Sequence, residues 1–519
     1  MTRRDRIVTL LCVLALAVAT VWMFATDLHL RPTETDDVLW VSRGAPSNPD
    51  WLHWLFGRAH FVGYRPLPAL TFTLDWWLGG GFEPVVYHGT DVLLHLVAVV
   101  LLVPLFRALF PAAPPSSGLV AAVLFAAHPA VAQVVPWFSR RSYVLAAVGV
   151  SGALLLVLRG RPWLGALALA AGLLSNETGF VAAPVVLLAA WSSAVSPAPS
   201  LARRVRAVAP LFVVTAAVFL ARWAIVGKVG GYSTYKGSLA RSAGVVGEAL
   251  HGVWAPDAAP ALVTTAALVV LVPLALWHLL VGAGTAPGRL LALWTLGAAG
   301  LVAMTGTWFH RLAYPFAVPV VLLVTAGLVP GGLFPRSRLA RLPSLALAAW
   351  ILAQSPLWRG LPADDLRFRV RMDAALATME TRLAEVPERG EVFLVEPWFR
   401  RGDANPYWKG GGRWAAHVTS YWASFVVLGR DVKIRELAAV KSRERWRGRA
   451  PRVVGSTIVF PVGTDLYLWP SRRDAREVPT ADLVVPLPAE RRPDSRVLFV
   501  DPLPGGLVTP APAPATSGR

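Results

Sequence analysis

Two adjacent carboxylates, Asp36 and Asp37, are the residues of this chain whose position best suits chemistry at a membrane surface. They follow the first long apolar segment, which ends near Ala25. Carboxylates are costly in hydrocarbon, so an acidic pair tethered just outside a span indicates a functional site at the face of the bilayer. A solvated loop turn is the alternative interpretation of the pair.

The elements that position this pair are membrane-spanning helices. Hydrophobic residues make up 55% of the 519 residues, charged residues 16%, and the mean hydropathy is +0.52, which excludes an ordinary soluble protein. A spanning helix needs about 17 to 25 apolar residues, and the sequence offers about eleven runs at or near that length. They lie near residues 7–25, 90–106, 118–136, 143–158, 162–175, 179–193, 208–226, 260–282, 290–308, 312–329 and 343–357. The predicted fold is a polytopic α-helical membrane protein.

Arginines predict which side of the membrane each connection occupies. If the N-terminus is cytoplasmic, every inside segment carries arginine, as the positive-inside rule requires. These segments lie at residues 3–6, 107, 159–161, 203–206, 289 and 336–341. We therefore predict a multi-pass inner-membrane protein. The outer face then carries the loop 27–88, the connections near 128–143, 176–177, 227–260 and 310–311, and everything after residue 357.

The formal net charge of +19 favours anionic lipid headgroups or lipid phosphates as partners. Nucleic acid is not expected, because the arginines are spread through short loops without an aromatic-interleaved soluble face. The sole cysteine, Cys12, lies in the first apolar run, so neither a disulfide framework nor a thiolate metal site is available. We expect no cofactor, and no ligand motif supports a divalent metal.

Residues 1–357 are predicted to form the transmembrane domain. Within its outer loop, residues 66–78 place Leu67, Leu70, Leu74 and Trp77 at helical spacing with Asp75 on another face. This pattern predicts an amphipathic helix resting on the bilayer.

Composition changes sharply near Trp358, which predicts a separate soluble α/β or α+β domain over residues 358–501. Helical periodicity covers 364–386, buried strands are expected at 392–395 and 425–428, and a hairpin is expected at 456–469 with its turn at Gly463. The Pro-rich segment 502–519 is predicted to be disordered.

A series of short motifs runs along residues 1 to 330. They are Asp36–Asp37, Tyr64–Leu67 followed by Asp75, Tyr87–His95, Ala126–Pro129, Trp137–Arg141, Ser175–Glu177 and Phe309–Pro315. Their order and spacing resemble the membrane region of bacterial relatives of the TPR-linked transmembrane O-mannosyltransferases, which are GT-C glycosyltransferases.

The resemblance implies a GT-C-like fold and a transferase that takes a sugar from a polyprenyl-phosphate carrier and passes it to an acceptor on the outer face. The family's first outer loop supplies an acidic catalytic residue, and Asp36 or Asp37 matches it. That carboxylate would act as general base on the acceptor hydroxyl while a lipid phosphate leaves.

The same resemblance implies cations that hold the donor phosphate. Arg311 is the first candidate, since its guanidinium can grip a phosphate bidentately at headgroup depth, and an interface anchor is its alternative. Arg65, Arg140 and Arg141 are further candidates, with interface packing as the alternative for Arg140 and Arg141. His128 either binds a phosphate or sugar oxygen or caps the end of a span.

Four residues are predicted to support the site. Asp91 stands where relatives commonly carry Asn. His95 lies two helical turns from His88 and either faces a cavity or belongs to the core. Glu177 is a second acid or a helix cap, and Tyr314 follows Arg311 by one helical turn.

Three functions remain open at this stage. The first is the glycosyltransferase, with a glycan, lipid or secreted protein as acceptor. The second is a flippase or transporter of lipid-linked sugars, which would need charges along a path through the membrane. The third is a catalytically inactive membrane scaffold, because family acidic positions such as Gln133 are lost.

Overall fold

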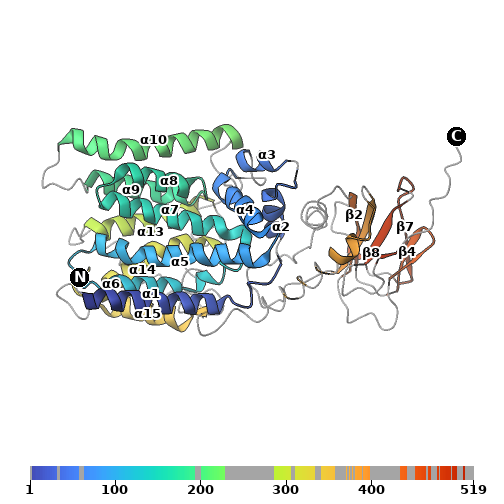
Figure 1. Ribbon diagram of the computed structural model, residues 1–519, viewed down its shortest axis with the longest axis horizontal. Helices are drawn as coiled ribbons and strands as arrows, with labels where there is room; N and C mark the ends of the chain where they lie inside the picture. Colours follow the sequence, from blue (N-terminus) through green and yellow to red (C-terminus); the bar gives the residue numbers. More distant parts are fainter. Residues whose placement is uncertain are drawn as a thin grey trace. The chain divides into compact units, whose positions relative to one another are not determined.

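The fold is that of a computed structural model of the chain (Figure 1). It describes residues 3–31, 35–48, 50–57, 63–192, 200–227, 286–305, 310–333, 341–356, 370, 373, 377, 380–387, 390–397, 433–440, 451–462, 466–468, 476–477, 480–492, 494–499 and 507–508. The strand predicted at 425–428 lies outside the described residues.

The chain divides into two compact units. The first comprises Met1–Leu28, Leu52–Thr71 and Val85–Leu361, and the second comprises His29–Trp51, Phe72–Pro84 and Pro362–Arg519. The sequence assigned the whole loop 27–88 to the membrane region. In the structure, the part of that loop that carries Asp36 and Asp37 groups with the C-terminal region instead.

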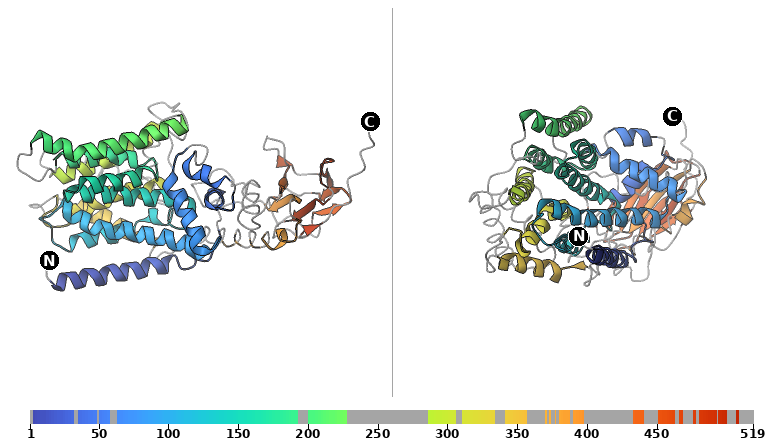
Figure 2. Two further views of the ribbon diagram at one scale, coloured as in Figure 1. Left: turned by 45° about the horizontal axis from the view of Figure 1, so that its top comes forward. Right: turned by 60° about the vertical axis from the view of Figure 1, so that its left-hand side comes forward.

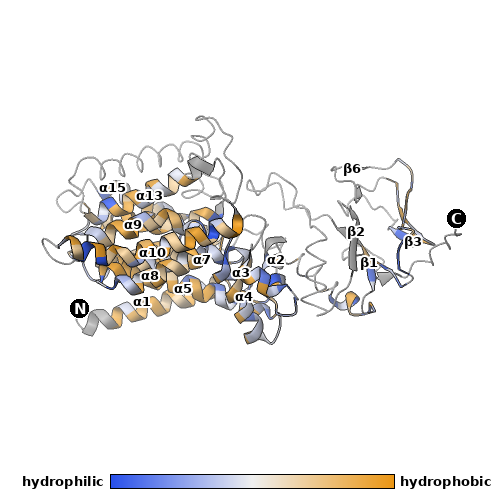
Figure 3. Cartoon of the chain, turned by 90° about the horizontal axis from the view of Figure 1, so that it is seen from above, coloured by the Kyte–Doolittle hydropathy of each residue, from blue (hydrophilic) through white to orange (hydrophobic). Residues whose placement is uncertain are grey.

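The first unit is a bundle of apolar helices that lie side by side (Figures 1 and 2). Hydrophobic residues dominate their length, as the hydropathy colouring shows (Figure 3). The helices are α1 (Arg3–Met23), α5 (Pro84–Leu109), α6 (Ser117–Ala126), α7 (Arg141–Leu158), α8 (Pro162–Leu173), α9 (Gly179–Ser192), α10 (Leu201–Val226), α13 (Ala286–Thr305), α14 (Ala313–Leu328) and α15 (Leu342–Ala353).

Among the described residues, three helices are long and apolar enough to cross a membrane, at Pro84–Leu109, Phe138–Leu158 and Leu201–Val226. Six shorter apolar helices accompany them. The count of about eleven spans stays a prediction.

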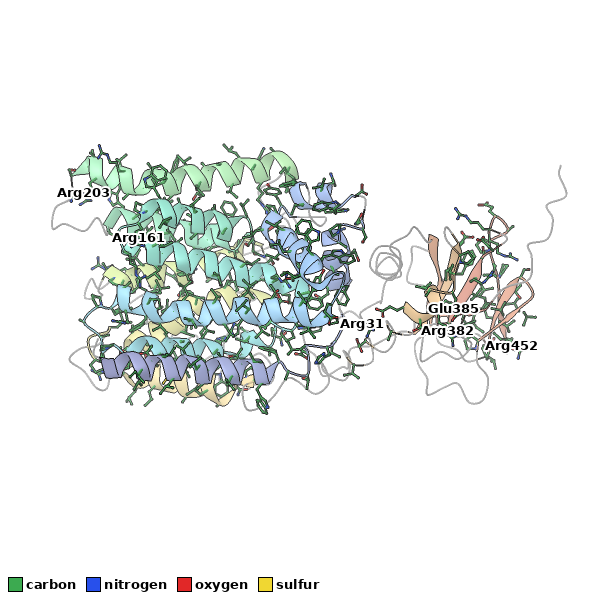
Figure 4. All side chains as sticks on the ribbon, viewed as in Figure 1. Arg31, Arg161, Arg203, Arg382, Glu385 and Arg452 are labelled. Carbon is green, nitrogen blue, oxygen red and sulfur yellow. The ribbon has the colours of Figure 1, made fainter. Side chains whose placement is uncertain are left out.

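From α5 to α10, and again from α13 to α15, successive helices run in opposite directions, so their connections alternate between two ends (Figure 1). Arg161, before α8, and Arg203, in the first turn of α10, lie at one end (Figure 4). The turns near His128, Glu177 and Arg311 lie at the other end. The arginine-rich connections are thus separated from the motif-bearing ones, although the side of the membrane that each end faces remains a prediction.

Two of the span boundaries that differ from the sequence prediction have a proline at or near them. The run 118–136 is helical only to Ala126, and then η1 (Pro129–Val131) and η2 (Phe138–Arg140) follow. The cause is Pro129, which disfavours helical backbone at His128 and sets that residue extended. The run 90–106 extends to Pro84 because proline suits the first turn of a helix.

The predicted amphipathic helix is present as α4 (Pro66–Gly79). Its outward face exposes Leu70, Leu74 and Trp77, whereas Phe72 and Asp75 are buried. The shorter helices α2 (Thr35–Gly44) and α3 (Trp51–Phe56) precede it.

The second unit contains two sheets. The six-stranded sheet has the order β6-β5-β2-β1-β8-β9, in which β1 is parallel to both β2 and β8. The three-stranded sheet has the antiparallel order β3-β4-β7. The strands are β1 (Glu391–Pro397), β2 (Lys433–Val440), β3 (Arg452–Val454), β4 (Thr457–Phe460), β5 (Leu466–Leu468), β6 (Arg476–Glu477), β7 (Leu483–Pro486), β8 (Arg496–Phe499) and β9 (Leu507–Val508).

The strand expected at 392–395 is confirmed within β1. The hairpin expected at 456–469 is wrong, because β4 pairs with β3 and β7 while β5 pairs with β2 and β6 in the other sheet. The turn falls at Gly455, whose φ of 58° favours glycine. Leu507 and Val508, in the segment predicted to be disordered, instead pair with β8.

Candidate functional site

A three-residue ion-pair cluster, Arg65–Glu177–Arg222, lies at the end of the bundle opposite Arg161 and Arg203. Arg65 donates from Nη2 to Glu177 Oε2 at 2.6 Å, and Arg222 donates from Nη2 to Glu177 Oε1 at 2.7 Å. The side chains of Arg65 and Arg222 are 7% and 4% exposed, and that of Glu177 is 23% exposed. The carboxylate is therefore bound on both of its oxygens.

Three segments bring this cluster together. Arg65 comes immediately before α4, Glu177 from the turn between α8 and α9, and Arg222 from the last turns of α10. Asn176 shapes the turn by accepting from the Thr178 backbone N–H and by donating to Ser142 Oγ. Glu177 is thus neither a helix cap nor an isolated acid.

The two arginines control the charge of Glu177. Burial alone would raise the pKa of this carboxyl, but the attraction of Arg65 and Arg222 outweighs burial and lowers the pKa to about 2. Glu177 is therefore ionised across the physiological range and is not poised to exchange protons.

A second ion pair joins Arg141, at the start of α7, to Asp91 in α5 with Nε and Oδ1 2.5 Å apart. Arg141 also donates to the Tyr87 carbonyl oxygen at 2.9 Å and to Thr71 Oγ1 at 3.3 Å. Both side chains are buried, at 0% and 1% exposure. Arg141 therefore fastens the start of α7 to α5 and α4, which accords with its structural alternative.

Arg140 and His128 hold the loop between α6 and α7. Arg140 donates to the Gln133 carbonyl oxygen, and its guanidinium lies 4.8 Å from the Trp137 ring centre. His128 Nδ1 accepts from the Ala130 backbone N–H at 3.1 Å, so His128 caps η1. Burial lowers its pKa to about 3, which keeps the imidazole neutral. Because Nδ1 accepts a hydrogen bond, the ring proton lies on Nε2.

His95 and Tyr314 meet inside the bundle. His95 Nδ1 lies 2.7 Å from the Tyr314 hydroxyl, which joins α5 to α14. Both residues are buried beside Phe125. His88 packs on Phe138 with ring centres 4.1 Å apart. The core alternative for these two histidines accords with these contacts.

Arg311 lies in η3 (His310–Leu312), immediately before α14, and its side chain is half-buried.

In the second unit, Asp37 is 1% exposed in the first turn of α2, and Asp75 is buried in α4. The structure describes the backbone of Asp36 but not its side chain. Within the described part of the chain, no group of three His, Cys, Asp or Glu residues is arranged to hold a metal ion.

Sequence reasoning missed Arg222. The available signal was a lone arginine near the end of an otherwise apolar run, because a charge at such a position needs a partner. The carboxylate partner, Glu177, is 45 residues away in the chain, so the sequence alone offered no means of pairing the two.

Comparisons with known proteins place these residues in context. No family model matches the chain. It is 35% identical over 109 residues to the protein O-mannosyl-transferase TMTC4 of Homo sapiens, a match that covers 19% of this chain and 15% of the human protein. It is 36% identical over 166 residues to the protein O-mannosyl-transferase Tmtc2 of Drosophila melanogaster, covering 28% and 18% of the two chains. The chain thus spans less than a fifth of the length of these relatives.

Among solved structures, ArnT from Cupriavidus metallidurans bound to undecaprenyl phosphate is 13% identical with a TM-score of 0.46, over 92% of this chain and 97% of ArnT. The Archaeoglobus fulgidus oligosaccharyltransferase is 12% identical with a TM-score of 0.42, over 81% and 62%. The relationship rests on the sequence matches. Over those stretches the chain is related to the TMTC protein O-mannosyl-transferases, which confirms the resemblance to relatives of these proteins.

Proposed function

We propose that this protein is a membrane glycosyltransferase that takes a sugar from a polyprenyl-phosphate-linked donor and passes it to an acceptor at the outer face of the inner membrane. The N-terminus is cytoplasmic, and the C-terminal domain is extracytoplasmic. The acceptor is a glycan, a lipid or a secreted protein. The observation that carries the proposal is the end of the bundle opposite Arg161 and Arg203, where Arg65 and Arg222 lie together with the motifs whose order and spacing resemble those of the transferases.

Arginines outnumber carboxylates among the described residues at this end of the first unit, so it attracts an anionic headgroup. The individual arginines differ in how far their side chains are enclosed. Arg141 is enclosed and Arg140 is engaged with its own loop. Arg311 is half-buried, and Arg65 and Arg222 share Glu177, whose side chain is 23% exposed. We assign the donor phosphate to Arg311, with Arg65 and Arg222 as its neighbours in the site.

Asp36 or Asp37 acts as the base. The acceptor oxygen attacks the anomeric carbon of the sugar as the bond from that carbon to the phosphate oxygen breaks. The acceptor proton passes to the carboxylate, and the lipid phosphate leaves with the electron pair. Cations around the phosphate stabilise the charge that develops there.

Incubation of the purified protein with radiolabelled polyprenyl-phosphate hexoses and pentoses tests this proposal. We expect release of polyprenyl phosphate with one class of donor. Replacing the base by Asn keeps the shape of the side chain but removes proton acceptance, so turnover should fall by about 10² to 10⁴ while donor binding persists. Full turnover in both Asp36→Asn and Asp37→Asn would remove the acidic pair from the mechanism.

A further inference from the structure

Arg31 lies five residues before Asp36 and is bound by two acids of the C-terminal region. Its Nε and Nη2 donate to the two oxygens of Glu380 at 2.8 and 2.9 Å. Its Nη1 and its backbone N–H donate to Asp373 Oδ1 at 3.2 and 2.9 Å. All three residues belong to the second unit. We call this set the Arg31 clamp.

The geometry of the clamp follows from helical spacing. Asp373, Ala377 and Glu380 are all in helical conformation, and their separations of four and three residues place them on one face. A planar guanidinium can reach one acid with two parallel bonds and still donate to the other. A lysine ammonium lacks this fork.

The segment that carries Asp36 and Asp37 is also held at its other end, beyond the acidic pair. Trp40 of α2 stacks on Phe72 with ring centres 5.9 Å apart, and Thr73 Oγ1 donates to the Gly44 carbonyl oxygen at 2.8 Å. Asp36 and Asp37, at the start of α2, therefore lie between two anchors. Five residues of chain span at most roughly 18 Å, so the clamp limits where the acidic pair can lie.

The clamp contributes more to geometry than to stability. Its side chains are 28%, 24% and 26% exposed, and ion pairs at such positions contribute little to the free energy of unfolding. The two carboxylates stabilise the charged form of Arg31. Hydrogen bonding to Glu380 raises the Arg31 pKa, and this effect outweighs burial, which would lower the pKa. A bidentate hydrogen bond fixes the orientation of the Arg31 side chain relative to the helical residue Glu380. A catalytic base likewise needs a fixed orientation relative to the acceptor hydroxyl.

We propose that Arg31, Asp373 and Glu380 are positioning residues through which the C-terminal domain holds the Asp36–Asp37 segment in its working geometry. This inference rests on the proposed transferase function. It gives the C-terminal domain a direct part in the reaction: a disturbance of its helix at Asp373 and Glu380 changes the placement of the base.

The test compares full-length Arg31→Gln, Glu380→Gln and the double variant with wild type. Arg382→Gln is the matched control, since Arg382 lies two residues after Glu380 and pairs with Glu385 at 46% and 52% exposure (Figure 4). We expect Arg31→Gln to lower kcat on the order of 10-fold to 10²-fold, with unchanged donor affinity and nearly unchanged Tm. The double variant should be no worse than Arg31→Gln, and Arg382→Gln should match wild type.

Hydrogen exchange separates this inference from the proposed function. Amides of α2 should exchange faster in Arg31→Gln than in wild type or Arg382→Gln, whether or not a donor is known. Absence of transfer by wild type with every donor would overturn the proposed function, while faster exchange would still support the clamp. Unchanged exchange, unchanged kcat in Arg31→Gln, or losses that multiply in the double variant would overturn the clamp.

Discussion

Glu177 is a fixed negative charge whose protonation costs the protein stability. Its pKa is lowered to about 2, so its stabilising contribution is present above its ordinary value of 4.5 and is lost as the pH falls toward 2. Since each tenfold change in acidity corresponds to about 1.4 kcal/mol, the pH-dependent contribution is about 3 kcal/mol.

Thermal unfolding of wild type and Glu177→Gln in detergent, from pH 7 to pH 3, measures this contribution. The difference in Tm should be largest at neutral pH and should narrow below about pH 4.5. Glu385→Gln, at an exposed position, is the control and should follow wild type. A difference that stays constant down to pH 3 would contradict the assignment of the charge to Glu177.

Arg311 is expected to hold the donor phosphate through its planar fork. Arg311→Lys keeps the charge but loses bidentate geometry, so it should weaken polyprenyl-phosphate binding, and Arg311→Ala should cost about 1.5 to 3 kcal/mol. Titration of purified variants with polyprenyl phosphate measures both effects. Arg203→Lys, at the opposite end of the bundle, is the control (Figure 4). Equal affinity of Arg311→Lys and wild type would return Arg311 to the role of interface anchor.

At the scale of elements, the close packing of α7 on α8 sets the position of the Asn176–Glu177 turn. A Cβ added at Gly149 would lie 2.4 Å from the Gly172 backbone nitrogen and 2.8 Å from the Ala168 carbonyl oxygen. Small residues allow such close approach between membrane helices. Gly149 therefore acts on the site from a distance, because α8 leads directly into the turn that carries Glu177.

Gly149→Ala should force α7 and α8 apart and destabilise the protein by about 1 to 3 kcal/mol, as is typical of overpacking. Gly152→Ala is the matched control on the same helix, since its nearest contacts would be side-chain atoms at 3.8 and 3.9 Å. Thermal unfolding of the two variants measures the difference. Equal stability would mean that α7 and α8 adjust to the added methyl group at little cost.

At the scale of the whole molecule, the positive-inside pattern assigns the two ends of the bundle to opposite sides of the membrane. In a Cys12→Ser background, Arg161→Cys tests the arginine-rich end, and Val454→Cys, at a position that is 50% exposed, tests the C-terminal region. A membrane-impermeant maleimide applied to intact cells should label the Val454→Cys variant, whereas the Arg161→Cys variant should react only after permeabilisation. The reverse pattern would invert the predicted topology.

The sequence by itself determined the apolar helices, the amphipathic α4 and the strand within β1, because hydropathy and periodicity are local properties. It also supplied the motifs whose order and spacing resemble those of the transferases. It did not determine the pairing of β4, since a choice among partner strands is settled by packing, whereas the end of α6 follows from Pro129 and was overlooked within the apolar run.

Tertiary structure alone decided which charges meet. Arg65, Glu177 and Arg222 come from three separate segments, and the sequence contains no signal that Arg222 should share Glu177 with Arg65. Likewise, Arg31 finds Asp373 and Glu380 more than 340 residues along the chain. Burial of a charge requires a partner, but any carboxylate that the fold brings within reach satisfies that requirement, so the identity of the partner is a property of the folded chain.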